Sequence, residues 1–341
     1  GRLPMSVETT STVSNPRSSP TTFRSVALSE SGGRVVLVIF LIVELIFFGL
    51  KVPGFLEVTN ILSAGRYTAV FLVVGVGTTF GLISGAIDIS IAGTIALSGS
   101  LGTQVMVAGA SPFVAIGVSL LIGAFAGLLN GIVVVKLRVN PLVATLGMLG
   151  VARGTAFLIE GGGGGVVGEM FRTFDPTFIV LQRKVLGIPL PVVFSLLVIG
   201  LGYVLLSHTR LGQYAYAVGG DPEAARAAAL PVDRLRIFFL MLSGFCAGIG
   251  GWMMASMLGG TAATIAVGWE LTIITAIIFG GVSLAGGIGS MMGTLLGTII
   301  LGFMVNGMNL AGWPTYHQLI AQGSLLLFAV GIDSLRSGGY R

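Results

Sequence analysis

Carboxylates within apolar sequence are the side chains of this chain best placed for chemistry. Glu44 lies in the first long apolar run, Asp88 lies in SGAIDISIAG, and Glu270 lies in VGWELTIITA. A carboxylate is costly to bury in an apolar environment, so each of the three is a candidate for a functional position. A structural role stays open for each. Glu44 can be protonated or reach an interface, Asp88 can cap a helix that begins near Ser90, and Glu270 can be a first-turn acid.

The sequence lacks the residue patterns that usually bind nucleotide phosphates or zinc. None of Lys51, Lys136 and Lys184 follows a glycine, so the chain has no GxxxxGK[ST] phosphate loop. The glycine-rich run 279–297 has no lysine after it and is typical of close helix packing and a tight reversal. Two histidines and one cysteine do not make an ordinary zinc site. We therefore expect no cofactor on this chain, and energy for any transport from an ion gradient or a separate subunit.

A polar stretch at 207–236 interrupts the apolar second half of the chain. In it, Asp221 is a good N-cap, Pro222 suits a first helical position, and Glu223 complements the positive helix end. Alanine-rich sequence follows until Pro231. This pattern predicts a helix of about two turns, and a helix so short needs something to pack against. We expect it to dock on another subunit.

Composition places these residues in an integral membrane protein. Of 341 residues, 54% are hydrophobic and 9% are charged, whereas a soluble domain carries about 25% charged residues. The apolar runs approach the roughly 20 residues that span a bilayer as a helix. The predicted fold is all-α, with about ten transmembrane helices and halves formed by spans 2–5 and 7–10 as inverted repeats, an arrangement suggested by an echo between 85–93 and 280–290. The predicted spans are 35–50, 62–82, 91–109, 113–135, 141–159, 189–206, 237–258, 270–286, 290–309 and 318–333.

Charge asymmetry predicts that both ends of the chain lie in the cytoplasm. The net charge of +5 is typical of basic cytoplasmic loops in such a chain and does not indicate nucleic-acid binding. Residues 1–33 are expected to form a disordered cytoplasmic tail, 34–335 the membrane domain and 336–341 a short tail, with 207–236 as a cytoplasmic loop. With this topology twelve of the 18 basic residues face inside: Arg2, Arg17, Arg24, Arg34, Lys136, Arg138, Arg210, Arg226, Arg234, Arg236, Arg336 and Arg341.

Two external connections are also expected. Residues 160–188 form the longest external loop, interpreted as a flexible turn that leads into a surface segment, with a landing site for an external partner as the alternative. Residues 310–317, with Trp313, Tyr316 and His317, resemble an interfacial aromatic anchor.

Five blocks, in order, resemble the permease subunit of ribose-type sugar importers of the ATP-binding cassette (ABC) class, within the superfamily that includes branched-chain amino acid permeases. The blocks are GLISGAIDISIAG, AGLLNGIVVVKLRVNPLVATLGMLGVARG, YAVGGDPEAARAAALPVDRLRI, WELTIITAIIFGGVSLAGGIGSMMGTLLG and NGMNL. The resemblance extends from about residue 35 to residue 333. One departure is Ala86, where the family usually has a second glycine.

The resemblance implies a permease of the bacterial plasma (inner) membrane that works by alternating access. It implies three kinds of protein partner: two ABC ATPase domains that bind ATP and magnesium, an extracytoplasmic sugar-binding protein, and a second permease copy, identical or similar. Carried over by position, the ATPase-coupling residues are Gly219, Gly220, Asp221, Pro222, Glu223, Ala225 and Arg226. The candidates for pathway or helix-packing positions are Asp88, Ser90, Asn130, Thr145, Glu270 and Asn306.

Other functions stay open beside import of a monosaccharide such as a pentose, a hexose or a related polyol. An ABC permease for branched-chain amino acids or vitamins would accept those solutes and no sugar. A gradient-driven secondary transporter would need no ATPase, but the chain shows few buried acids and no carboxylate relay. A membrane enzyme would need a nucleophile, base and orienting group, which the sequence does not supply.

Overall fold

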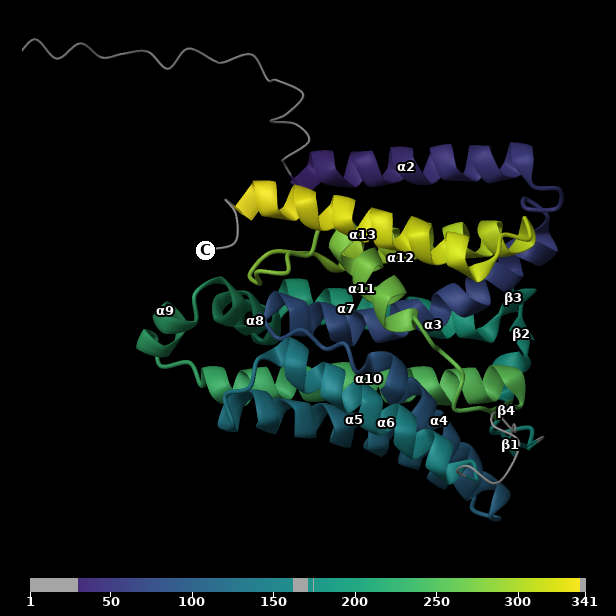
Figure 1. The fold of residues 1–341 in the computed structure, drawn as a ribbon, viewed down its shortest axis with the longest axis horizontal. Helices are drawn as coiled ribbons and strands as arrows, with labels where there is room; N and C mark the ends of the chain where they lie inside the picture. The colour runs from purple at the N-terminus through teal and green to yellow at the C-terminus, as the bar shows by residue number, and fades with distance from the viewer. Residues whose placement is uncertain (1–29, 162–170, 174, 338–341) are drawn as a thin grey trace, which may run out of the picture.

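The computed structural model describes residues 30–161, 171–173 and 175–337 of the chain. Its long helices run side by side along the long axis of the molecule (Figure 1). In chain order the helices are α2 (Glu30–Lys51), α3 (Val58–Ile83), α4 (Ile91–Val107), α5 (Pro112–Lys136), α6 (Pro141–Ile159), α7 (Leu190–His208), α8 (Arg210–Gly220), α9 (Pro222–Ala227), α10 (Val232–Leu258), α11 (Trp269–Phe279), α12 (Met291–Leu310) and α13 (Thr315–Ser337).

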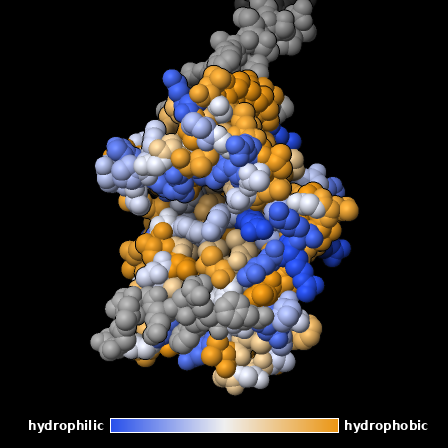
Figure 2. All heavy atoms as spheres, turned by 90° about the vertical axis from the view of Figure 1, so that its right-hand side faces the viewer, coloured by the Kyte–Doolittle hydropathy of each residue, from blue (hydrophilic) through white to orange (hydrophobic). Residues whose placement is uncertain are grey.

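The two ends of the bundle differ. Helices α8 and α9 lie at one end, where α2 begins and α13 finishes, so residues 30 and 337 share an end as the predicted topology requires (Figure 1). Short strands gather at the opposite end: β1 (Phe171–Arg172) pairs with β4 (Gly260–Thr261), and β2 (Lys184–Val185) pairs with β3 (Ile188–Pro189). We call these the α8–α9 end and the strand end. Figure 2 shows hydrophilic residues gathered across the strand end, with hydrophobic residues toward its edges.

The helical membrane class is confirmed. Each predicted span overlaps one helix. Among the described residues, seven helices are long and apolar enough to cross a membrane by length and composition, and α4 and α11 are shorter apolar helices. Ten crossings and inverted halves stay predictions. The predicted tail at 1–33 lies mostly outside the described residues, as do the glycines at 162–165 in the predicted flexible loop.

Several boundaries differ from the predicted ones. The span predicted at 270–286 is wrong in its second half, because α11 ends at Phe279 and Gly281 adopts a φ of +93°, which favours glycine. Helix α2 begins at Glu30, inside the predicted tail, and α13 continues to Ser337, inside the predicted C-terminal tail. Helix α10 begins at Val232, inside the predicted cytoplasmic loop.

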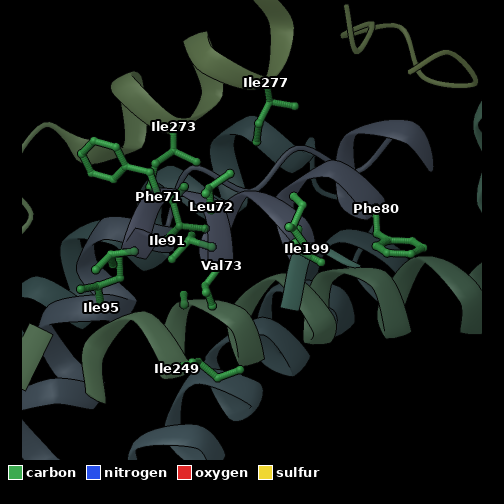
Figure 3. Close-up of a cluster of buried hydrophobic side chains, with 14 of the residues drawn as sticks. Phe71, Leu72, Val73, Phe80, Ile91, Ile95, Ile199, Ile249, Ile273 and Ile277 are labelled. Atoms are coloured by element: carbon green, nitrogen blue, oxygen red, sulfur yellow. The ribbon is translucent and has the colours of Figure 1, made fainter. Parts of the chain in front are cut away.

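A hydrophobic core joins α3, α4, α7, α10 and α11. Figure 3 shows its members, among which Phe80, Ile91 and Ile277 are fully buried. Beside this core, α5 and α10 pack backbone against backbone, since a Cβ added to Gly123 would lie 2.3 Å from the carbonyl oxygen of Gly244. Small residues permit such close approach between membrane helices.

Two short helices each follow a largely buried segment without helical structure. Residues 84–90, the first break, connect α3 to α4, and residues 259–268, the second break, connect α10 to α11. Such backbone is tolerated at membrane depth only when protein or a water-filled cavity surrounds it. Of the two segments in the predicted sequence echo, 85–93 overlaps the first break, whereas 280–290 lies outside the second break. Residues 280–290 instead connect α11 to α12.

Candidate coupling and translocation site

Helix α9 is the predicted short helix, and its local structure follows the sequence signals. The Asp221 carboxylate accepts hydrogen bonds from the backbone N–H groups of Glu223 (2.9 Å) and Ala224 (3.0 Å), which confirms the N-cap. The helix has six residues, Pro222–Ala227, or about 1.7 turns at 3.6 residues per turn.

One side of α9 packs inward and the other is free. Ala225 is buried in a small apolar cluster with Val218 of α8 and Val232 of α10. Glu223 and Arg226 are exposed. The cluster therefore holds α9 against its two neighbouring helices and leaves a polar surface exposed.

Helix α8 was not predicted, although its sequence contained a signal. The Thr209 hydroxyl accepts from the Leu211 N–H (3.2 Å), and Leu211, Ala215 and Val218 follow one another at helical spacing. The three glycines within 210–220 masked this pattern, because glycine is a poor helix former.

The end of α8 packs closely, backbone against backbone, on the rest of the bundle. A Cβ added to Gly219 would lie 1.7 Å from the carbonyl oxygen of Ile83, the last residue of α3, and 2.7 Å from the Gly287 nitrogen. The Gly287 N–H donates to the same Ile83 carbonyl at 2.8 Å. Gly85 and Gly286 lie beside Gly219 as well. We call these five residues the glycine junction.

The glycine junction joins three parts of the chain that are far apart in sequence. They are the end of α8, the start of the first break and the 280–290 connection. The Tyr216 hydroxyl of α8 also donates to the Gly289 carbonyl at 2.8 Å. Because a side chain cannot fit at Gly219, α8 cannot shift toward α3 without moving the end of α3 and the 280–290 connection.

Three predicted pathway residues meet in the first break. The Asp88 carboxylate accepts from the Ser90 N–H (3.0 Å) and the Ser90 hydroxyl (2.6 Å), and the Asn130 amide of α5 donates to Ser90 (2.9 Å) and Asp88 (3.4 Å). All three side chains are only 1% exposed. Ser90 is the N-cap of α4, and Asp88 supports that start through its hydrogen bonds to Ser90. The network can orient the first break, while the second Asp88 oxygen has no hydrogen-bond partner and lies near Ser243 of α10.

The other predicted pathway residues lie elsewhere. The Thr145 hydroxyl donates to the Pro141 carbonyl within α6 (2.8 Å), and Asn306 of α12 exchanges amide hydrogen bonds with Asn60 of α3 (2.9 and 3.2 Å). Glu270 is the acidic residue in the first turn of α11. Glu44 is buried in α2 with neither carboxylate oxygen hydrogen-bonded. The structure thus gathers Asp88, Ser90 and Asn130 into one site and leaves the others apart.

The second break is held by two side chains that sequence reasoning did not select, Arg153 of α6 and Glu160, the C-cap residue of α6. Arg153 donates to the carbonyls of Ala263 and Ile265 in the break and to the Ala92 carbonyl of α4. Glu160 accepts from the Ala263 N–H (2.6 Å) and from the Ser100 hydroxyl of α4 (2.7 Å). The available signal was the position of Arg153 inside a predicted span, where a charged residue is costly and seldom lacks a role. We call Arg153 and Glu160 the α6 clamp.

Metal ligands are not gathered anywhere in the described part of the chain. Within residues 30–161, 171–173 and 175–337, no three His, Cys, Asp or Glu side chains form a group that could hold a metal ion. The buried network at Asp88 has one carboxylate, so its chemistry is hydrogen bonding.

A family model and the named relatives all identify this chain as similar to permease components of transport systems. The family described as "Branched-chain amino acid transport system / permease component" matches residues 60–330. The chain is 33% identical over 287 residues to the ribose import permease protein RbsC of Escherichia coli K12, covering 83% of this chain and 88% of that protein. It is 34% identical over 329 residues to the L-arabinose ABC transporter permease protein AraH of Azospirillum brasilense, covering 94% and 95%. It is 32% identical over 300 residues to the D-allose transport system permease protein AlsC of Escherichia coli K12, covering 88% and 90%. No solved structure matches the chain.

Proposed function

The chain belongs to the branched-chain amino acid transport system permease family, as a multi-pass inner-membrane protein on the sugar-importer side of that family, and from this premise we propose what it carries and how it is driven. It is the membrane subunit of an ATP-driven importer that brings a monosaccharide, a pentose, a hexose or a related polyol, into the cytoplasm. The names of its relatives, permeases for ribose, arabinose and allose, support a sugar over a branched-chain amino acid or a vitamin.

The observation that carries the proposal is the glycine junction behind α9. Helix α9 exposes Glu223 and Arg226 and is fixed to α8 through the Val218 and Ala225 cluster. A load applied to α9 by a partner therefore reaches Gly219, which touches the end of α3 and the 280–290 connection. This is the mechanical path expected when another chain supplies the energy for alternating access.

Partners follow from the same arrangement. Two ATPase subunits, which would bind ATP and magnesium, dock at the α8–α9 ends of two permease copies. A sugar-binding protein docks at the hydrophilic strand end. The sugar passes between the two permeases, and the Asp88, Ser90 and Asn130 network lies in a break where it serves either the pathway or helix packing. A gradient-driven transporter is the weaker alternative, since it leaves the exposed surface of α9 without a role.

The coupling residues can be tested in the assembled transporter. We expect Glu223→Ala with Arg226→Ala to lower ATPase co-purification and binding-protein-stimulated ATP hydrolysis about tenfold, the change that a loss of about 1.4 kcal/mol produces, because arginine is enriched among the interface residues that contribute most to binding. Two controls isolate the effect. Asp233→Asn breaks the exposed Arg226–Asp233 ion pair (3.1 Å) without removing Arg226, and Arg234→Ala removes an exposed charge next to it.

Each outcome bears on the proposal. Unchanged assembly and hydrolysis in the double variant would remove α9 from coupling. Uptake into proteoliposomes that needs a proton or sodium gradient and no ATPase would replace the ABC mechanism. Uptake of amino acids or vitamins, with no uptake of any sugar, would overturn the substrate class and leave the coupling result intact.

A further inference from the structure

A basic pocket lies at the α8–α9 end, and one of its residues, Arg236, lies beside Gly85 of the glycine junction. It has a volume of about 750 Å³ and lies between the turn that joins α5 to α6 and the region where α9 meets α10. Arg138 comes from the turn, Arg226 from α9, and Asp233 and Arg236 from α10. The other lining residues are Val134, Val135, Val139, Asn140 and Pro141. Neither Arg138 nor Arg236 has been given a role above.

The pocket carries more positive charge than its own carboxylate can balance. Three guanidinium groups and one carboxylate give a net charge of +2, and Asp233 is already paired with Arg226 at 3.1 Å. Among the described residues, Arg138 and Arg236 have no ion-pair partner, and the Nε of Arg236 is buried without a hydrogen-bond partner. A buried N–H group without a partner is costly, so an anionic oxygen from outside the chain would stabilise the pocket.

The backbone around Arg138 holds its side chain at this place. Arg138 adopts a φ of +56°, the left-handed region that non-glycine residues seldom occupy. The Val139 N–H donates to the Val133 carbonyl across the turn (3.4 Å), and the Asn140 side chain caps α6 through the Leu142 N–H (2.9 Å). Backbone strain of this kind clusters at ligand-binding and active sites.

The surroundings of the pocket indicate which kind of anionic molecule would bind there. Leu137, directly after α5, precedes the lining residue Arg138, and Leu142 and Val143 follow the lining residue Pro141 in the first turn of α6; they are 68%, 45% and 64% exposed. Their exposure extends the apolar surface of two membrane-spanning helices up to the arginines. An arginine pocket above an apolar surface at the cytoplasmic side of a membrane protein suits a lipid head group.

We propose that Arg138 and Arg236 bind the phosphate group of an anionic phospholipid, with the acyl chains lying against Leu137, Leu142 and Val143. Bidentate contact between guanidinium and phosphate supplies the specificity, which a lysine cannot reproduce. A Cβ placed on Gly85, a member of the glycine junction, would lie 3.8 Å from the Arg236 guanidinium. A bound lipid therefore contacts an arginine that touches the first break. The proposal needs the membrane location and the predicted cytoplasmic placement of the α8–α9 end, and not the sugar-import function.

The test uses the full chain purified in a neutral detergent and titrated with phosphatidylglycerol or phosphatidylcholine, with bound lipid read by native mass spectrometry. We expect preferential binding of phosphatidylglycerol and about tenfold weaker binding in Arg138→Gln and in Arg236→Gln. Lys136→Gln is the matched control, since it removes the same charge two residues from Arg138, and Lys136 does not line the pocket. It should change binding less than about twofold.

The remaining outcomes separate the possible sources of the anion. Equal losses in Lys136→Gln and the arginine variants would mean general surface attraction and overturn the pocket. If inorganic phosphate protects the wild type from thermal unfolding in an Arg138-dependent way and phosphatidylglycerol does not bind, the ligand is free phosphate and the lipid proposal fails. If neither binds but ATPase assembly falls in Arg138→Gln, an acidic segment of the partner occupies the pocket and the proposal fails. Should Arg138→Gln not fold, Arg138→Lys keeps the charge, and binding equal to wild type would overturn the bidentate contact.

Discussion

The two breaks have similar places in the fold and are held in different ways. Each lies between a long buried helix and a short apolar one. The first break is fixed by backbone contact, since Gly219 leaves no room for even one added carbon beside Ile83. The second is fixed by charged side chains, since Arg153 and Glu160 bond to its carbonyl and N–H groups.

This difference determines how each break can respond to force. Repulsion between closely packed backbones rises steeply, so the glycine junction is suited to transmit a displacement of α8. Hydrogen bonds from a guanidinium group are directional and can be exchanged for bonds to water. The first break is therefore suited to follow α8, and the second to be released and re-formed at the strand end.

The largest effect is expected at the glycine junction. Gly219→Ala places a Cβ 1.7 Å from the Ile83 carbonyl oxygen, and should cost about 3 kcal/mol or more, because backbone rather than a flexible side chain must move. We expect a clearly lower melting temperature for the purified chain and loss of stimulated ATP hydrolysis in the assembled transporter.

Gly220→Ala is the matched control, since an added Cβ there meets nothing within 4 Å. It should melt at or slightly above the wild-type temperature, because alanine favours the helix. Similar behaviour of the two variants would show that the close approach at Gly219 does not fix the first break.

The α6 clamp should show a smaller effect. Arg153→Met leaves the carbonyls of Ala92, Ala263 and Ile265 without their donor and should destabilise the chain by about 2 kcal/mol, the typical cost of losing hydrogen bonds to a charged group. Arg153→Lys should be intermediate, because an ammonium group cannot reproduce the planar fork.

The control for the clamp is Arg66→Met, at a half-buried arginine of α3 that makes no hydrogen bond among the described contacts. The melting temperatures of Arg153→Met, Arg153→Lys and Arg66→Met are compared, together with the protease sensitivity of the 259–268 segment in each variant. If Arg153→Met melts like Arg66→Met and the segment stays protected, the second break is held by packing and the contrast between the breaks is lost.

The sequence indicated the parts of this architecture that depend on local chemistry. Apolar runs located the spans, and Asp221, Pro222 and Glu223 located α9, because caps and hydropathy act within one segment. The glycine junction could not be derived in the same way. Gly85, Gly219 and Gly287 are separated by more than sixty residues at each step, and glycine alone does not reveal which backbone it approaches. Arg153 was visible as a charge within a span, but its carbonyl partners lie on α4 and in the second break.

Asp88 should show the smallest effect on stability, and it connects the two ways of holding a break. It is a charged residue like those of the clamp, yet it lies in the break that the glycine junction contacts. Asp88→Asn keeps the oxygen that accepts from Ser90, and its new amide can donate to the unpartnered Ser243 hydroxyl, so stability should change by less than about 1 kcal/mol. Asp88→Ala removes the acceptor and should destabilise the chain more.

We expect Asp88→Asn to retain expression and sugar uptake, because the observed contacts use the carboxyl group as a hydrogen-bond acceptor and pair it with no cation. A variant that melts like the wild type but does not transport would assign the negative charge to the pathway, and the first break would then combine a mechanical contact with a chemical one.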